Sequence, residues 1–245
     1  MNRFYHPSSL ELKQKINLSA KAAHHAVHVM RLKIEDKIVL FHNDLFDYTA
    51  IIKCINKKNV EVYVESRIKN LTQPTVHFRL FQTLTTNEKM DWIIQKSVEL
   101  GVGSIIPIYS ERSLIKLHGD RAEKKLSHWQ QIIISASEQS GRSKLPNITL
   151  PKKIDAYSNE DDIKRPHLKL MLSPGAHTSI NSIQMQSPCT VDIMIGPEGG
   201  FTKQEIKDAV SNEFLPISLG PRILRTETAP LAILSLLQYK YGDFA

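Results

Sequence analysis

The pattern of hydrophobic and polar residues changes near residues 67–75. Before this point the apolar runs are short and separated by turn-forming residues, which is typical of β-strands. Ser19 is suited to capping a helix over residues 20–30. Strands are expected at residues 37–41, 48–55 and 59–66. The first part of the chain, residues 1–72, is therefore predicted to be a small, mostly β domain.

After Pro74, apolar runs of strand length alternate with segments of helical periodicity. Asn87 is expected to cap the first helix, and Thr202 with Glu205 matches the capping box. The alternation predicts a parallel sheet covered by helices, and hence an α/β domain over residues 73–245. Strands are expected at residues 77–84, 104–109, 168–172, 191–195 and 214–219, and helices at residues 87–100, 121–140, 203–212 and 230–241.

Two glycine loops follow the last two predicted strands. Residues 196–201 read Gly-Pro-Glu-Gly-Gly-Phe, and residues 219–229 read Leu-Gly-Pro-Arg-Ile-Leu-Arg-Thr-Glu-Thr-Ala. In open α/β sheets ligands bind outside the carboxyl ends of the strands, and glycine lets the backbone approach a ligand closely. The two loops are therefore expected to form one site. Alternatively, residues 199–200 form only a tight turn before the capping box.

The choice of ligand is narrowed because the two loops lack residues that other nucleotide-binding loops require. A phosphate-binding P-loop needs a Lys and a hydroxyl directly after its last glycine, whereas Phe201 and Thr202 follow Gly200. The glycines also lack the spacing of a dinucleotide-binding loop. The loops therefore favour a single nucleoside-like molecule held by backbone groups.

The composition indicates the net charge of the chain and its expected cellular compartment. The chain carries 32 Lys and Arg against 25 Asp and Glu, a formal net charge of +7, which favours an anionic partner such as nucleic acid. No apolar stretch has the length of a membrane span and the N-terminus has no signal segment, so a cytoplasmic protein without membrane contact is expected. Cys54 and Cys189 are expected to be buried small hydrophobes. His24 and His28 share a helix face, but no third ligand is identifiable, so no metal site is expected.

Several motifs along the chain carry a resemblance to a known family. They lie at residues 24–33, 91–101, 110–113 (Ser-Glu-Arg-Ser), 138–142 (Glu-Gln-Ser-Gly-Arg), 196–201 and 219–229. Taken in this order, they resemble the ribosomal small-subunit RNA methyltransferase E family. The resemblance spans nearly the whole chain.

The resemblance implies a fold and an activity. The family belongs to the SPOUT superfamily, so the C-terminal domain is expected to be an α/β domain with a deep trefoil knot. A PUA-like RNA-binding domain, a small β-barrel, is expected in front of it. The implied activity is methyl transfer from S-adenosylmethionine to N3 of a uridine in the decoding region of 16S rRNA in the small ribosomal subunit. A homodimer with the site beside the subunit interface is implied as well.

In this family the two glycine loops form the cofactor cleft. Backbone groups of the loops are expected to hold the adenine and ribose, and Ile195 or Leu224 to pack on the adenine. A third segment, beginning at residue 172, is expected to complete the cleft, with side-chain roles for Ser173 and His177 left open. The expected cofactor-binding residues are Leu172, Ser173, Ile195, Gly196, Pro197, Glu198, Gly199, Gly200, Leu219, Gly220, Arg222, Ile223, Leu224, Thr226, Thr228 and Ala229.

Methylation at N3 requires the uracil N3–H to lose its proton. Arginine stays protonated, so it can stabilise negative charge on the uracil carbonyl oxygens but cannot act as the base. We expect Arg225, supported by Arg222 or Arg142, to stabilise the anion. The proton would pass to Glu227, Glu138 or a water molecule.

Some of these residues could serve a different purpose. Arg222 and Arg225 could equally contact RNA phosphates, and Glu227 with Thr228 could cap the last helix. Trp92 and Trp129 are expected in the core or at a dimer interface. The residues expected to contact RNA are Arg3, His24, His25, Arg31, Lys33, Arg112 and Arg142, with Lys57 and Lys58 as further basic groups.

Two other functions remain open at this point. One is a methyltransferase of the same superfamily that acts on a different RNA or a different atom. The other is an inactive RNA-binding factor for ribosome assembly, against which the intact loops argue.

Overall fold

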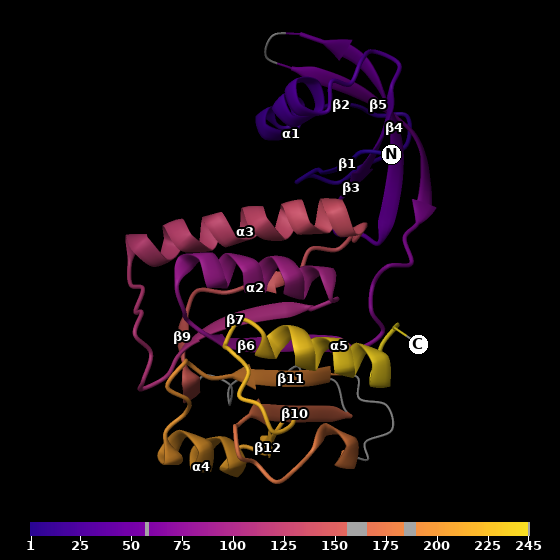
Figure 1. Ribbon diagram of the computed structural model, residues 1–245. Coiled ribbons are helices and arrows are strands. Elements are labelled where there is room, and N and C mark those ends of the chain that lie inside the picture. The colour runs from indigo at the N-terminus through magenta and orange to yellow at the C-terminus, as the bar shows by residue number, and fades with distance from the viewer. Residues whose placement is uncertain (57–58, 156–165, 184–189, 245) are drawn as a thin grey trace. The chain divides into compact units, whose positions relative to one another are not determined.

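The computed structural model describes residues 1–56, 59–155, 166–183 and 190–244. They form two compact units (Figure 1). The first unit comprises Met1–Gln73 and Ser137–Leu145, and the second comprises Pro74–Ala136 and Pro146–Ala245. Residues 137–145 thus belong with the N-terminal residues, although the second unit surrounds them in the sequence. The hydrophobic pattern gave no indication of this return.

A five-stranded mixed sheet forms the first unit. Its order is β1-β3-β4-β5-β2, with β1 parallel to β3 and the other pairs antiparallel. The strands are β1 (Arg3–Tyr5), β2 (Lys15–Asn17), β3 (Lys37–Phe41), β4 (Phe46–Ile55) and β5 (Val60–Lys69). The three longer strands were predicted. Strands β1 and β2 were missed, because a strand of three residues is too short to show an alternation of apolar and polar positions.

One short helical segment packs on this sheet. The α1 helix (Ala20–His24) begins at Ser19, whose Oγ accepts a hydrogen bond from the Ala22 N–H at 3.2 Å. It continues directly as a π-helical turn, His25–Val29. Its buried alanines, Ala22, Ala23 and Ala26, join the core of the unit. Cys54 is only half-buried, so its expected burial was wrong, and Cys189 lies outside the described residues.

The returning segment is fixed to the first unit by polar contacts. Asn70 Nδ2 donates to the Gly141 carbonyl at 3.0 Å, and the Leu145 N–H donates to Asn43 Oδ1 at 2.7 Å. The Tyr5 N–H donates to Glu138 Oε1 at 3.0 Å. The last turn of helix α3 (Asp120–Ser140) therefore belongs structurally with β1 and with the residues after β5.

The second unit is built on a seven-stranded parallel sheet. Its order is β12-β10-β11-β6-β7-β8, with β9 also paired to β7, and every described pair is parallel. The central strand β11 is buried along its whole length, as its apolar sequence predicts. The strands are β6 (His77–Thr83), β7 (Ser104–Tyr109), β8 (Asn147–Ile148), β9 (Lys152–Lys153), β10 (His167–Leu172), β11 (Thr190–Ile195) and β12 (Leu215–Ile217).

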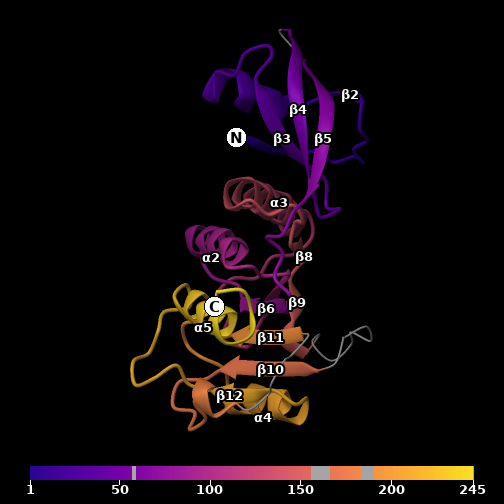
Figure 2. The ribbon, with the colours of Figure 1, turned by 90° about the vertical axis from the view of Figure 1, so that its right-hand side faces the viewer.

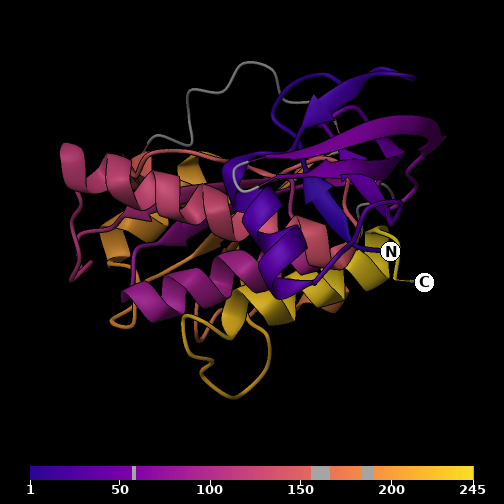
Figure 3. The same ribbon diagram turned by 90° about the horizontal axis from the view of Figure 1, so that it is seen from above.

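Helices cover this sheet as the alternation predicted. Figure 2 and Figure 3 show α2 (Asn87–Glu99) and α5 (Ala229–Tyr241) side by side, while α4 (Lys203–Ser211) lies next to β12. The capping box of α4 is present, because Thr202 Oγ1 accepts from the Glu205 N–H and Glu205 Oε2 accepts from the Thr202 N–H. The cap of α2 is Thr86 instead of Asn87, which is the first helical residue, and the Thr86 side chain makes no capping bond.

The two tryptophans of the second unit differ in environment. Trp129 is 1% exposed, whereas Trp92 on α2 is 50% exposed and is not a core residue. No helix among the described residues has both the length and the apolar character needed to cross a membrane.

Candidate active site

A cavity of about 700 Å³ opens at the carboxyl edge of the parallel sheet, within the second unit. Its walls are the segments that follow β10, β11 and β12, together with Lys89 in the first turn of α2. These segments are far apart in the sequence and meet because β12, β10 and β11 are neighbours in the sheet. The two glycine loops do therefore form one site.

Backbone conformation accounts for two of the glycines. Gly200 has a φ of +68° and Gly220 a φ of +110°, which side chains of L-residues rarely adopt. A Cβ at either position would point into open space, so both are required for conformation and leave the cavity wall bare. A ligand can therefore approach the backbone at these points.

Hydrogen bonds hold the two loops together at the base of the cavity. Thr226 Oγ1 donates to the Gly196 carbonyl at 3.0 Å, and Gln82 Nε2 donates to Thr226 Oγ1 at 3.3 Å. Thr83 Oγ1 donates to the Ile195 carbonyl at 2.8 Å. The polar end of β6 thus fixes both loops against the sheet.

The segment after β7 supports the first glycine loop from outside. Arg112 Nη1 donates to the Gly199 carbonyl at 2.8 Å. The Glu111 N–H donates to Glu205 Oε1 at 2.8 Å, so the buried carboxylate of the capping box also holds this segment. Arg112, expected from sequence to contact RNA, has this structural contact to the first glycine loop.

A second polar group, the Lys89 cluster, consists of Lys89, Glu198 and Glu227. Lys89 Nζ lies 3.1 Å from Glu198 Oε1 and 3.3 Å from Glu227 Oε2. Thr85 Oγ1 donates to the same Glu198 oxygen at 2.8 Å. Lys89 and Glu198 line the cavity. Sequence reasoning missed Lys89, although its place one turn into the helix after β6 put it at the carboxyl edge of the sheet.

Partial burial alone would raise the pKa of Glu198. The hydrogen bonds from Thr85 and Lys89 outweigh this effect and hold its pKa below the usual value. The hydrogen bond to Glu198 in turn raises the pKa of Lys89. Both groups are therefore charged at neutral pH.

Most residues expected to bind the cofactor line the cavity. Thr228 alone among them does not; it occupies the cap position of α5 without a capping side-chain bond. The other fifteen positions, which run from Leu172 and Ser173 through Ile195–Gly200 to Leu219–Ala229, are at the wall. Their contact with a cofactor stays a prediction.

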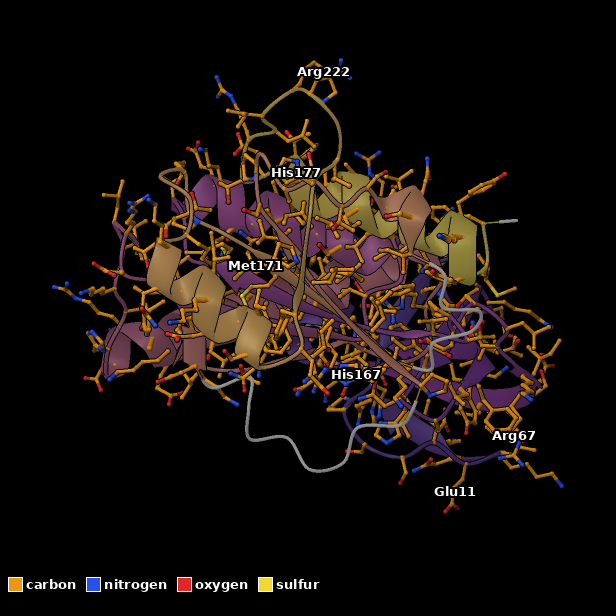
Figure 4. All side chains as sticks on the ribbon, turned by 90° about the horizontal axis from the view of Figure 1, so that it is seen from below. Glu11, Arg67, His167, Met171, His177 and Arg222 are labelled. Carbon is orange, nitrogen blue, oxygen red and sulfur yellow. The ribbon has the colours of Figure 1, made fainter. Side chains whose placement is uncertain are left out.

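The candidate catalytic residues fall into two groups. Arg222 and Arg225 line the cavity, and Figure 4 shows Arg222 at the outer end of the loop between β12 and α5. His177, whose role was left open, lies on the same side of the unit as Arg222. His167, the first residue of β10, lies at the opposite end of that strand from the cavity. Glu227 is not a wall residue and reaches the cavity only through Lys89. The suggestion that Glu227 caps α5 finds no support, because its carboxylate pairs with Lys89.

Glu138 and Arg142 lie in the first unit instead. Arg142 is buried and donates to Gln73 Oε1 at 3.2 Å. Burial raises the pKa of Glu138, while the bond from the Tyr5 N–H opposes that shift. Both side chains are used in packing there, so their proposed catalytic roles stay predictions without structural support.

The basic residues of the first unit are not equally accessible. His24, Arg31 and Lys33 are exposed and His25 is half-buried. Arg3, expected to contact RNA, is largely buried and pairs with Asp47 at 2.6 Å, and its contact with RNA stays a prediction. Lys57 and Lys58 lie outside the described residues. His24 and His28 stack with ring centres 4.8 Å apart, and the part of the chain that is described contains no cluster of three metal-ligating side chains.

Comparison with known families defines the class of protein. A model of an RNA methyltransferase domain matches residues 72–238, and a model of an RNA methyltransferase PUA domain matches residues 18–65. The chain is therefore an RNA methyltransferase with an N-terminal PUA domain.

Individual relatives narrow the class further. The chain is 39% identical to ribosomal RNA small subunit methyltransferase E from Buchnera aphidicola subsp. Schizaphis graminum, over 99% of this chain and 98% of the relative. It belongs to the ribosomal RNA small subunit methyltransferase E family. The fold expected from the motifs, a SPOUT-type α/β methyltransferase domain behind a PUA-like domain, is confirmed.

Two solved structures share the whole architecture. The methyltransferase E of Neisseria gonorrhoeae, bound to S-adenosylmethionine, is 35% identical with a TM-score of 0.92 and full coverage of both chains. A methyltransferase from Legionella pneumophila, also with S-adenosylmethionine, is 36% identical with a TM-score of 0.93, covering 99% of this chain and 98% of that one.

Proposed function

We propose that the protein methylates N3 of a uridine in the decoding region of 16S rRNA. S-adenosylmethionine is the methyl donor, and rRNA of the small ribosomal subunit is the substrate. The observation that carries the proposal is the cavity between the two glycine loops, in a chain whose close structural relatives bind this cofactor.

The cavity suits a nucleoside-sized cofactor. Its volume of about 700 Å³ lies within the range usual for small-molecule sites. Ile195 and Leu224 offer apolar surface for an adenine ring, and the bare backbone at Gly200 and Gly220 can approach a ribose. When bound, the cofactor supplies a methyl group on a sulfonium, whose departure leaves a neutral thioether.

Arg225 is our candidate for stabilising the uracil anion. Its guanidinium belongs to the cavity wall and is exposed, so a uracil placed there can reach it. A fixed positive charge beside the carbonyl oxygens favours the form of uracil that has lost its N3 proton. Arg222, at the outer end of the same loop, is better placed for RNA phosphate.

The structure favours water as the acceptor of the N3 proton. The carboxylate of Glu227 is engaged by Lys89, and that of Glu138 by the Tyr5 N–H in the first unit. Neither is a wall residue of the cavity. A water molecule at the cavity mouth would carry the proton to solvent while Arg225 stabilises the negative charge.

A homodimer in the cytoplasm completes the proposal. Trp92 on α2 and Leu236 and Tyr239 on α5 are 50%, 43% and 70% exposed, on two helices that pack side by side. Large apolar side chains gathered on neighbouring helices indicate a protein contact, and a second copy of the chain is the partner that the family resemblance implies.

The decisive experiment identifies the modified nucleoside. Small subunits that lack the modification are incubated with the protein and S-adenosylmethionine labelled in its methyl group, and the digested rRNA is analysed. We expect labelled 3-methyluridine. A different labelled nucleoside would favour another RNA methyltransferase activity, and RNA binding without transfer would favour an assembly factor.

Substitution of Arg225 tests its role. Arg225→Ala should slow single-turnover methyl transfer by about 100-fold, because the anion loses its fixed positive charge. Cofactor affinity should change little. Arg121→Ala is the control, since Arg121 is exposed on α3 and is not at the cavity wall. An unchanged rate in Arg225→Ala with normal cofactor binding would remove Arg225 from the mechanism.

A further inference from the structure

The Lys89 cluster places one ammonium and one carboxylate, those of Lys89 and Glu198, at the cavity wall, with a second carboxylate, that of Glu227, behind Lys89. Lys89 comes from α2, Glu198 from the loop after β11, and Glu227 from the loop before α5. Its formal net charge is therefore −1. The side chains of Lys89, Glu198 and Glu227 are 29%, 42% and 19% exposed, so solvent screens the charge of Glu198 more than that of Glu227.

Charge is unevenly distributed along the cavity wall. The other charged wall residues are Arg222 and Arg225, both positive and both in the loop that precedes α5. The wall is thus positive at the two arginines, whereas Lys89 and Glu198 balance each other and Glu227 behind them makes the Lys89 cluster net negative. A cation inside the cavity is stabilised near the cluster and repelled by the arginines.

The two forms of the cofactor differ in one charge. The substrate form carries a positive sulfonium, and the product left after methyl transfer carries a neutral thioether. All other groups of the two molecules, apart from the transferred methyl, are the same. A net negative cluster beside the cavity can therefore discriminate between them by Coulomb attraction alone.

We propose that the Lys89 cluster is a charge-selective subsite that favours S-adenosylmethionine over its demethylated product, S-adenosylhomocysteine. The inference rests on the proposed function, because it concerns the same cavity. Within the cluster, Lys89 joins the two loops and limits the negative charge to −1, so that the cavity is selective without holding two unopposed carboxylates. Selection against the neutral form helps the product to leave after each transfer.

The test measures the ratio of two dissociation constants by calorimetry on the full chain at pH 8. Glu198→Gln makes the cluster formally neutral, and we expect the preference for S-adenosylmethionine to fall by about threefold to tenfold, from one charge pair in partly screened surroundings. Lys89→Met makes the cluster formally −2, and the preference should rise by about the same factor. Both variants loosen the loops, but that loss is common to both ligands and cancels in the ratio.

Matched controls come from an ion pair elsewhere. Lys53 Nζ lies 2.9 Å from Glu35 Oε1 in the first unit, and neither residue is at the cavity wall. Lys53→Met and Glu35→Gln should leave the ratio unchanged. An analogue with a protonated amine in place of the sulfonium should follow S-adenosylmethionine in every variant, which separates the effect of charge from that of the methyl group.

The outcomes are distinct. Opposite changes in the ratio for Glu198→Gln and Lys89→Met support the subsite. Equal weakening of both ligands in both variants would reduce the cluster to a structural clamp and overturn the inference while the proposed function stands. Failure of the unsubstituted protein to bind either ligand would overturn both.

Discussion

At Asp192, three neighbouring strands meet around one buried carboxylate. Arg79 of β6 donates to it from Nε and Nη2, both at 2.6 Å, and His167 Nε2 of β10 lies at 3.1 Å. Burial alone would raise the pKa of Asp192, but the hydrogen bonds from His167 and Arg79 lower it below the usual value. A carboxylate whose pKa is lower in the folded state stabilises the fold above its unfolded pKa of about 3.9, and this contribution is lost as the pH falls through the folded pKa.

Asp192→Asn should lower the free energy of unfolding of the second unit at pH 7 by about 3–5 kcal/mol, because the buried Arg79 loses its charged partner. The difference from the unsubstituted protein should shrink as the pH falls below about 4, where the unfolded chain takes up a proton at Asp192 first, and should be smallest below the lower folded pKa of Asp192. Urea unfolding followed by tryptophan fluorescence reports on this unit, since Trp92 and Trp129 both lie in it. Asp208→Asn, an exposed change on α4, is the control and should lower the free energy of unfolding by less than about 0.5 kcal/mol. If Asp192→Asn lowered the free energy of unfolding equally at pH 7 and below about pH 4, Asp192 would not be ionised in the folded protein at pH 7.

At the scale of elements, one carboxylate joins a helix start to a distant strand end. Glu205 Oε2 closes the capping box of α4 through the Thr202 N–H, and its Oε1 accepts from the Glu111 N–H after β7. The next residue, Arg112, holds the Gly199 carbonyl. The first glycine loop follows β11, yet its position depends on the cap of α4 and on the segment after β7.

Glu205→Ala should destabilise the second unit by about 1–3 kcal/mol, because two backbone N–H groups lose their acceptor. It should also weaken binding of S-adenosylmethionine, because the segment that carries Arg112 is released. Thermal unfolding and calorimetric titration measure the two effects. Gln204→Ala removes only an exposed bond to Asp208 on the same helix and should change neither by much. Normal cofactor affinity in a clearly destabilised Glu205→Ala would show that the glycine loop holds its shape without this support.

At the scale of the whole molecule, the exposed apolar side chains of α2 and α5 are the basis for the proposed dimer. Lys96 Nζ lies 5.1 Å from the ring centre of Trp92 and 2.8 Å from Glu99 Oε1, so a charged pair borders this apolar side chain. A polar rim around an apolar centre is the usual composition of a protein interface.

Trp92→Glu should shift the protein from dimer to monomer, because a carboxylate would be buried against the second copy. The fold should persist, since Trp92 is half exposed within one chain. Sedimentation velocity at several concentrations measures the change. Val210→Glu on α4, at a side chain 49% exposed, should leave the dimer intact. A Trp92→Glu protein that sediments as the unsubstituted chain does would place the interface elsewhere.

The sequence by itself determined the longer helices and strands of the chain and the class of site. Strands β3 and β7 have the predicted bounds, and the capping box marks the start of α4, because these features depend on residues close in sequence. The glycine loops were recognisable for the same reason, since a positive φ at Gly200 or Gly220 is a local requirement. The motifs then sufficed to indicate the family.

Only the tertiary structure decided which distant groups meet. The sheet order β12-β10-β11-β6-β7-β8 places strands side by side that are separated in sequence, and it thereby brings Lys89 to Glu198 and Glu227. The return of residues 137–145 likewise groups Glu138 and Arg142 with the first unit, although the second unit surrounds them in the sequence. Local pattern fixes a backbone segment, whereas such contacts depend on how the sheet is assembled, and no periodicity within one segment records that order.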